Sequence, residues 1–334
     1  MARTYGTWPY NLMQIGPETT PGTAVAAVDI LRGIFGGFDD DRQVETIEEN
    51  IGELMPAERS RITSEGIVIP MPATALTYEQ LPVLLEMGIQ TATPSGSGPY
   101  TRAYAFPTGG AVNTIKTYTA EIGNRLVTDD LIKVPYCWME EIEISGEAQG
   151  LWQMGGTIRG QRDVALVSFA SASLPAVEEA VFANTEFYVD DSGDTIKTTQ
   201  YTGILMGARI NIKTGIMWVP AANGTLYPVR HKHGRPSATF TLTYELEDGD
   251  AATSFVAQER AAYKAQEIRL IQMNIPGSGD REIRIMMAAK YDKPGAYSNS
   301  DDNTTVDFEG HAVYSSDDSL AFEIEVDNNL ATLH

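Results

Sequence analysis

The sequence predicts a mainly β fold with short flanking helices, on three observations. Apolar and polar residues alternate strictly over 208–213 and 238–246, which is the pattern of a strand with one buried and one solvated face. A helical pattern over 254–266 follows, with Thr253 or Ser254 as its cap. A third strand over 268–275 ends at a Pro-Gly pair, so this region is predicted as strand, strand, helix, strand.

A similar order of elements occurs in the first half of the chain. A short helical signal at 77–87 follows two strand-like runs; Thr77 with Gln80 resembles a capping box, and Pro82 favours either a later helix start or a kink. The expected strands of this half are 39–54, 61–71, 112–122, 136–145 and 151–159, the last two as a hairpin. The halves share no residue-level identity, so element order alone predicts an internal duplication.

The predicted organisation has four parts. Residues 1–30 form an apolar, irregular N-terminal arm that packs on its own domain or on a neighbour. The other parts are a first β domain (31–165), a linker with a hairpin (166–200) and a second β domain (201–334). The second domain is expected to end in a hairpin formed by residues 306–314 and 320–326.

Composition excludes several classes of function. The 334 residues carry a net charge of −21 with a pI near 4.5, which argues against a nucleic-acid-binding surface. No run approaches 18 apolar residues, so no membrane span and no membrane partner are expected. Cys137 is the single cysteine and no signal-peptide pattern is evident, which fits assembly in a cytosol.

Charged and aromatic residues near the N-terminus are the candidate assembly site. A charge-rich ribbon at 39–66 is either a solvated hairpin or a docking arm that pairs with another subunit. The residues proposed to contact a neighbouring ring of subunits are Trp8, Tyr10, Asp39, Asp40, Asp41, Arg42, Glu48, Glu49, Arg59 and Arg61.

No residue pattern indicates catalysis, so no enzyme activity, cofactor or metal is expected. His231 and His233 are spaced for a shared metal on a strand, but no third ligand lies nearby in sequence. The acidic turn at 190–194 lacks the glycine and glutamate of a calcium loop. Carboxylates are abundant, and nothing singles out an acid pair of the glycosidase kind.

Four stretches of the chain are similar to one known family. Residues 16–26 (Gly-Pro-Glu-Thr-Thr-Pro-Gly-Thr-Ala-Val-Ala) resemble an opening glycine-glutamate-x-x-x-Gly-Thr stretch. The strand at 201–212, the Gly-Arg-Pro turn at 234–236 with the strand and helix after it, and the last strand at 322–328 add to the likeness. Together they resemble the major tail tube proteins of long, flexible-tailed (siphovirus-like) phages, over most of the chain and with no single diagnostic residue.

The resemblance implies both a fold and a role. The fold is a β-sandwich or half-barrel with a flanking short helix, duplicated here, whose strands close into a ring-shaped β-barrel on oligomerisation. The role is a structural virion protein that polymerises as stacked rings into the tail tube, through which DNA passes to the host at genome ejection. Trimeric, pseudo-hexameric rings are favoured over hexameric rings, and an acidic lumen would let DNA slide without binding.

The same resemblance implies partners and a location. The partners are further copies of the chain, a tape measure protein, a tail terminator and baseplate proteins. The location is the virion tail, after assembly in the host cytoplasm. Two alternatives stay open: a decoration or baseplate subunit, and a carbohydrate-active or carbohydrate-binding β-sandwich that would use Trp8, Trp138, Trp152 or Trp218 as a sugar platform.

Overall fold

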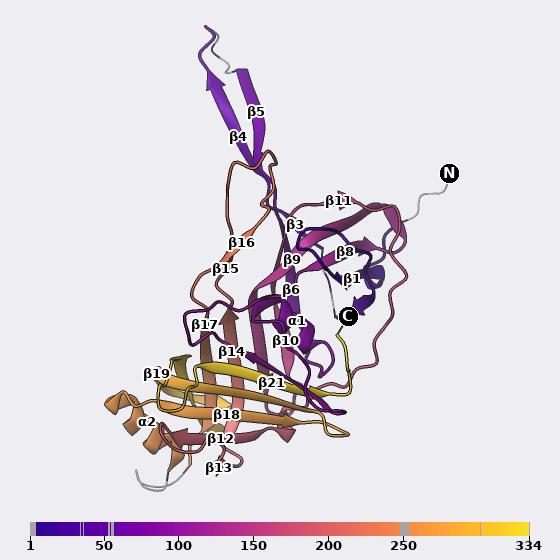
Figure 1. The fold of residues 1–334 in the computed structure, drawn as a ribbon. Coiled ribbons are helices and arrows are strands. Elements are labelled where there is room, and N and C mark those ends of the chain that lie inside the picture. The colour runs from indigo at the N-terminus through magenta and orange to yellow at the C-terminus, as the bar shows by residue number, and fades with distance from the viewer. Residues whose placement is uncertain are drawn as a thin grey trace.

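The computed structural model describes residues 5–33, 35, 37–52, 54, 57–247, 254–300 and 302–333. These residues are mainly β, as the sequence predicts (Figure 1). The helical elements are α1 (Leu81–Gly88), α2 (Phe255–Ala265) and the 3-10 turns η1 (Trp8–Tyr10) and η2 (Phe182–Asn184). No helix in the described ranges is both long and apolar enough to cross a membrane.

The largest layer is a long antiparallel sheet of eight strands. Their order across the sheet is β3 (Asp39–Asp40), β6 (Ile67–Ala75), β10 (Gln153–Gly160), β9 (Val127–Glu147), β14 (Leu205–Lys213), β17 (Ser237–Glu245), β20 (Asn303–Ala312) and β19 (Glu282–Ser300).

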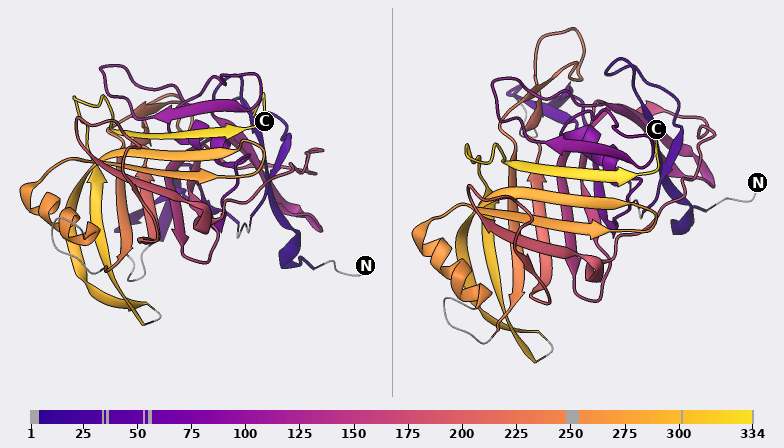
Figure 2. Two further views of the ribbon diagram at one scale, coloured as in Figure 1. Left: turned by 90° about the horizontal axis from the view of Figure 1, so that it is seen from below. Right: turned by 60° about the horizontal axis from the view of Figure 1, so that its bottom comes forward.

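Two smaller antiparallel sheets cover one face of the long sheet. The first has the order β2 (Asp29–Leu31), β1 (Asn11–Pro17), β8 (Tyr118–Asn124), β9 and β11 (Val164–Ala165). The second has the order β13 (Gln200–Tyr201), β12 (Glu186–Asp191), β18 (Arg269–Pro276), β19, β21 (Phe322–Asn328) and β7 (Tyr100–Ala105). The long strands β9 and β19 therefore belong to both layers, and the outer strands cross the long sheet (Figure 2).

The core lies between these layers and follows from the alternation of the strands. In β17, Ala238, Phe240, Leu242 and Tyr244 are buried while the threonines between them face away from the core. Buried side chains of the long and outer sheets belong to one continuous apolar cluster. The sandwich therefore has one buried face per sheet, and the opposite face of the long sheet is left to solvent.

Both helices lie where the sequence signals them, although the N-cap residue of α1 is Gln80 and the full Thr77–Gln80 capping box is not formed. The Ser254 hydroxyl caps α2 by accepting a bond from the Ala257 amide at 3.4 Å, and the helix ends at Gln266 in a left-handed conformation. Thr77 accepts a bond from the Gln80 amide, and α1 begins at Leu81, just before Pro82. Of the two outcomes expected from Pro82, the later helix start is therefore confirmed.

Two hairpins leave the long sheet at the same end of the molecule. The larger consists of β4 (Gln43–Glu49) and β5 (Ala57–Ser64), and it projects far beyond the body (Figure 1). The smaller consists of β15 (Ile216–Trp218) and β16 (His231–His233). The Glu65 amide donates to the Leu226 carbonyl at 2.9 Å, so the chain between β15 and β16 contacts the base of the larger hairpin.

Several sequence predictions are wrong in detail. Residues 1–30 are not an irregular arm throughout, because residues 11–17 form β1, which pairs along its whole length with β8. The strand expected at 112–122 begins only at Tyr118, and β7 was not predicted. The C-terminal segments 306–314 and 320–326 do not pair with each other, since β20 lies between β17 and β19 and β21 lies between β19 and β7.

Candidate assembly surfaces

The long sheet ends in two strands that have a hydrogen-bonded neighbour on one side only, among the residues described. β3 pairs with β6, and residues 290–300 of β19 pair with β20. Edge strands present unpaired backbone donors and acceptors, which readily pair with another chain. The two ends of the sheet are therefore the first candidate assembly surface.

The eight strands fall into two blocks of four whose pairings correspond one to one. The first block is β3, β6, β10 and β9, and the second is β14, β17, β20 and β19. In each block the long strand continues into an outer sheet, where β9 pairs with β8 and β11 while β19 pairs with β18 and β21. The next outer strand is β1, which pairs with β8, in the first block and β12, which pairs with β18, in the second. Each strand of the first block and its outer sheet therefore has a counterpart in the second.

The blocks meet where β9 pairs with β14. Seven residues of β14, from Gly207 to Lys213, lie opposite residues 141–147 of β9. On the exposed side the Arg209 guanidinium donates to the Glu143 carboxylate at 2.8 Å. On the core side Ile210 lies opposite Ile144, and both are fully buried. One junction of this sheet is thus a seven-residue ladder with paired charges on one face and apolar contact on the other.

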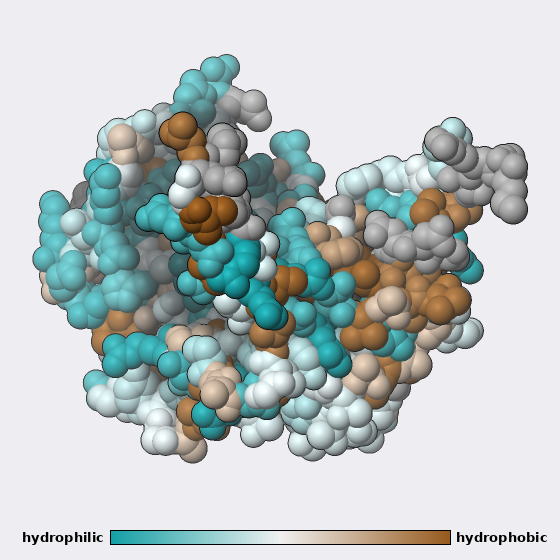
Figure 3. Space-filling model, turned by 90° about the horizontal axis from the view of Figure 1, so that it is seen from above, coloured by the Kyte–Doolittle hydropathy of each residue, from teal (hydrophilic) through white to brown (hydrophobic). Residues whose placement is uncertain are grey.

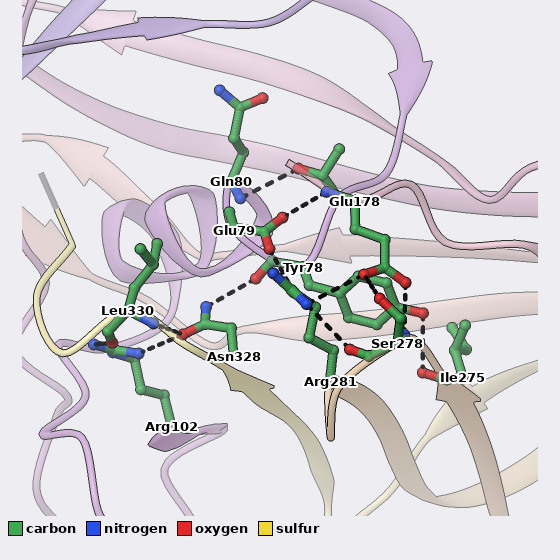
Figure 4. Close-up of polar contacts among 11 residues, drawn as sticks. Tyr78, Glu79, Gln80, Arg102, Glu178, Ile275, Ser278, Arg281, Asn328 and Leu330 are labelled. Atoms are coloured by element: carbon green, nitrogen blue, oxygen red, sulfur yellow. Dashed lines mark hydrogen bonds and ion pairs between the residues drawn. The ribbon is translucent and has the colours of Figure 1, made fainter. Parts of the chain in front are cut away.

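A buried polar network also ties the blocks together (Figure 4). From the segment before α1, the Tyr78 hydroxyl donates to the Ile275 carbonyl at 3.3 Å, and the Glu79 carboxylate accepts a bond from Arg281 at 2.8 Å. Arg281 also lies 3.3 Å from Glu178. Burial, reinforced by the negative charge of Glu178, raises the pKa of Tyr78, so its hydroxyl remains a donor at ordinary pH.

The face of the long sheet that points away from the core is hollowed and acidic. Two open hollows of about 520 Å³ and 560 Å³ lie over β9, β14 and β17. Within the long sheet, β9, β10, β14, β17 and β20 carry three cations and seven carboxylates, a net charge of −4. The cations are Arg159, Arg209 and Lys213, and the carboxylates are Glu140, Glu141, Glu143, Glu147, Glu245, Asp307 and Glu309.

The β4–β5 hairpin carries four of the residues that the sequence singled out. Arg59 donates to Glu49 across the hairpin at 2.5 and 3.1 Å, and Glu48 and Arg61 are exposed on the same ribbon. The hairpin also exposes apolar side chains, namely Val44, Ile47, Ile51, Leu54 and Ile62, with Leu54 fully exposed. Figure 3 looks onto this end of the molecule and shows apolar patches in a largely hydrophilic surface. Several exposed apolar side chains on one charged hairpin, with no core behind them, indicate a binding surface.

The other predicted acidic residues lie at the base of the hairpin and are paired within the chain. Asp41 accepts a bond from Arg159 at 3.0 Å. Arg42 lies 2.7 Å from Asp40 and also contacts Asp163. Asp39 and Asp40 form β3, which pairs with β6. This pairing and the ion pairs of Asp41 and Arg42 hold the base of the hairpin against the edge of the long sheet.

Trp8 and Tyr10 lie apart from the hairpin cluster, on the turn between β8 and β9. The Tyr10 carbonyl accepts a bond from the Arg125 amide at 3.0 Å, and the Thr7 carbonyl accepts one from the Asn124 side chain at 2.9 Å. Their rings stay exposed, Trp8 at 59% and Tyr10 at 46%. The structure thus anchors this segment to its own chain and leaves the aromatic rings on the surface.

Sequence reasoning missed the structural part played by Glu18, which it quoted only within a motif. The carboxylate is 2% exposed and accepts four bonds of 2.8–2.9 Å, from the Gly22 and Tyr136 amides and the Thr117 and Thr119 hydroxyls. Tyr136 has a φ of +57° and stands where β9 passes from the outer sheet to the long sheet. Glu18 therefore holds the bend of β9.

The histidine pair and the tryptophans are also placed by the structure. His231 lies 3.1 Å from the Tyr136 hydroxyl, and burial, with His233 adding to it, lowers the pKa of His231. Within the described ranges, no three side chains of the His, Cys, Asp or Glu kind are arranged to hold a metal ion. Trp138 and Trp152 are buried, so neither presents a face to a sugar.

Neither protein-family models nor curated proteins show a match to this chain.

Proposed function

We propose that the protein is a self-assembling structural subunit of a tail tube of the long, flexible-tailed phage kind. Copies join edge to edge into rings, the rings stack, and DNA passes through the lumen to the host. Its partners would be further copies, a tape measure protein, a tail terminator and baseplate proteins, in a virion tail assembled in the host cytoplasm.

One observation carries this proposal above the others. The long sheet consists of two blocks with the same pairings in the same order, and among the described residues each of its end segments, β3 and residues 290–300 of β19, has a neighbouring strand on one side only. A head-to-tail repeat of this kind is a heterologous arrangement, which closes into a ring or continues as a filament. We interpret the blocks as two copies of one tail-tube unit, so that three chains complete a ring with sixfold pseudo-symmetry.

The dimensions of such a ring suit a tube. Three chains supply 24 strands from the eight strands of each long sheet. At about 4.8 Å per strand, the circumference is at least about 115 Å and the width between opposite backbones at least about 37 Å, and strand tilt widens both. Barrels of 16–18 strands already enclose an aqueous channel. Closure also removes both exposed edges, which is the usual remedy for unpaired strands.

The exposed face and the hairpin support the two remaining parts of the proposal. The hollowed face carries a net charge of −4 on five strands, and a lumen of that sign would repel phosphates and let DNA slide. The β4–β5 hairpin extends beyond the sheet with exposed apolar side chains, as a contact with the next ring requires.

Solution mass and negative-stain microscopy of the purified chain test the proposal together. We expect rings or hollow tubes, with rings of three chains in the dissociated material. A chain that stays monomeric at every concentration and ionic strength, also after addition of preformed tube ends, would refute the assembly role.

A further inference from the structure

We propose that residues 37–41 of one copy pair with residues 293–298 of β19 in a second copy, with Asp41 opposite Lys293 and Phe38 against Tyr297. This inference rests on the proposed function and specifies the strands and the register that join neighbouring subunits. We derive it from the β9–β14 pairing, which joins the two blocks within one chain and serves as the template for the pairing between chains.

The long strands of the two blocks align through a shared irregularity. β9 has one residue without a register partner in β10, Glu140, at its entry into the long sheet, and β19 has one without a register partner in β20, Asp292, at the same place. The partner strands β10 and β20 continue without interruption there. Glu141 and Lys293, each the residue after its bulge, are therefore equivalent positions.

The first strands of the blocks align by counting across the sheet from those bulges. The count makes Ile69 of β6 equivalent to Phe240 of β17, and the buried Ile67, Ile69 and Met71 then coincide with the buried Ala238, Phe240 and Leu242. The match ends there, because β17 continues with the buried Tyr244 whereas β6 passes a bulge and has no buried residue at that level. The Asp41 amide donates to the Gly66 carbonyl at 2.9 Å, which puts Asp41 at the position that Lys213 occupies in β14. By the same count Phe38 is equivalent to Ile210.

The charges at the two junctions are complementary with opposite sign. Within the chain, Lys213 of β14 lies opposite Glu141 of β9. Between copies, the equivalent positions are Asp41 and Lys293. A lysine–glutamate pair is thus replaced by an aspartate–lysine pair, as complementary edges require, because like charges directly opposite each other destabilise a strand pair.

The apolar side of the junction is matched as well. Ile210 lies opposite Ile144 within the chain. β19 has a second bulge at residues 295–296 that β9 lacks, so the count through its partner strand β20 makes Tyr297 equivalent to Ile144. The equivalent pair between copies is therefore Phe38 with Tyr297. Phe38 is partly buried against the core, whereas Tyr297 is 56% exposed with the Arg260 guanidinium 4.8 Å from its ring centre. A second copy would cover this exposed ring, and paired aromatic side chains stabilise neighbouring strands.

The alignment also accounts for the length of β3. β14 has nine residues and a neighbour on each side, whereas its counterpart β3 has two residues and one neighbour. Docking on β19 supplies the missing neighbour, so β3 lengthens across residues 37–41. A strand that forms only on docking loses conformational entropy at that step, which makes the joint between copies weaker than the joint inside the chain.

A crossing strand distinguishes the two joints further. Inside the chain, β7 follows α1 and pairs with β21 of the other block. Only residues 266–268 separate α2 from β18, so the second block has no counterpart of β7 to reach into a neighbouring copy. A ring would therefore open between chains and release intact monomers.

Disulfide formation in assembled material tests the register. The variant with Asp41→Cys and Lys293→Cys is assembled, oxidised and run on a denaturing gel; the native Cys137 is buried and serves as an internal blank. We expect a covalent ladder that ends at the number of chains in a ring. The matched control pairs Asp41→Cys with Ser300→Cys, which lies about 23 Å further along β19 at about 3.3 Å per residue. It loses the same Asp41–Arg159 ion pair and should give no ladder.

A second variant gives a readout that does not depend on sulfur geometry. Lys293→Asp places a carboxylate opposite Asp41, so tube yield should fall at low salt and recover at high salt, where the repulsion is screened. Tubes that show no 41–293 ladder, or an equal ladder for 41–300, would overturn this register while leaving the proposed function intact. Failure of the unaltered chain to form rings or tubes under any condition would instead refute the proposed function.

Discussion

Removing the carboxylate of Glu18 is expected to destabilise the first block strongly. Replacement by alanine strips four hydrogen bonds from a site that is 2% exposed and leaves the Tyr136 amide without a partner. Each buried donor left unsatisfied costs about 1–3 kcal/mol, and the two threonine hydroxyls can turn to other acceptors. Counting the Tyr136 and Gly22 amides, we expect a loss of about 2–6 kcal/mol.

Replacement of Glu18 by glutamine should be nearly as harmful, which makes this prediction specific. One carboxylate oxygen accepts from the Tyr136 amide and the other from the Gly22 amide. Whichever way a glutamine amide is turned, its NH₂ group faces one of these N–H donors. A simple loss of charge with the shape conserved would predict a much smaller effect.

Urea unfolding followed by circular dichroism measures the effect. The unaltered protein, Glu18→Ala, Glu18→Gln and the exposed control Glu48→Gln are compared, and the control should stay within about 0.5 kcal/mol. The partners of Glu18 lie in β9 of the first block and in the segments packed beside it. If the two blocks unfold at different urea concentrations, only the unfolding of the first block should therefore shift. A Glu18→Gln variant as stable as the unaltered protein would refute the reasoning.

Three further predictions concern the network, the histidines and the hairpin. Arg281→Ala leaves the 5%-exposed Glu79 carboxylate without its cation and should cost about 3–5 kcal/mol in the same unfolding assay, with partial rescue in Arg281→Lys. His231 has a lowered pKa, so it contributes stability that is fully present above about pH 6.5, the ordinary value for histidine, and is lost as the pH falls from there through the lower pKa of the folded state. A fluorescence titration of Trp218 should show this acid loss, and His231→Gln should reduce the pH dependence to the part that His233 contributes. Ile51→Ser with Leu54→Ser should leave unfolding unchanged but prevent tubes, whereas Val112→Ser, at an exposed apolar residue outside the hairpin, should leave tubes intact; tubes of normal length from the hairpin variant would contradict the stacking role.

Local patterns in the sequence predicted the elements better than their partners. The alternation in β17, the cap at Ser254 and the hairpin of β9 with β10 are confirmed, because each depends on neighbouring residues. The pairing of β20 and β21 was wrong, since the apolar alternation of a strand does not specify which distant strand lies beside it.

The candidate site shows the same limit. The charged ribbon was recognisable from composition, but the division between a paired base at Asp40–Arg42 and an exposed apolar tip at Leu54 depends on contacts with Arg159 and Asp163. Glu18 appeared only as a motif position, because its four donors come from three separate segments. The equivalence of Asp41 and Lys213 required the register of the whole sheet.

Electron microscopy of the assembled chain, averaged down the tube axis, tests the central claim most directly. If the two blocks are copies of one unit in a closed ring, the cross-section should show threefold symmetry with six similar lobes around an open lumen lined by the hollowed acidic face. A ring of six chains, or a lumen lined by lysine and arginine, would contradict the account.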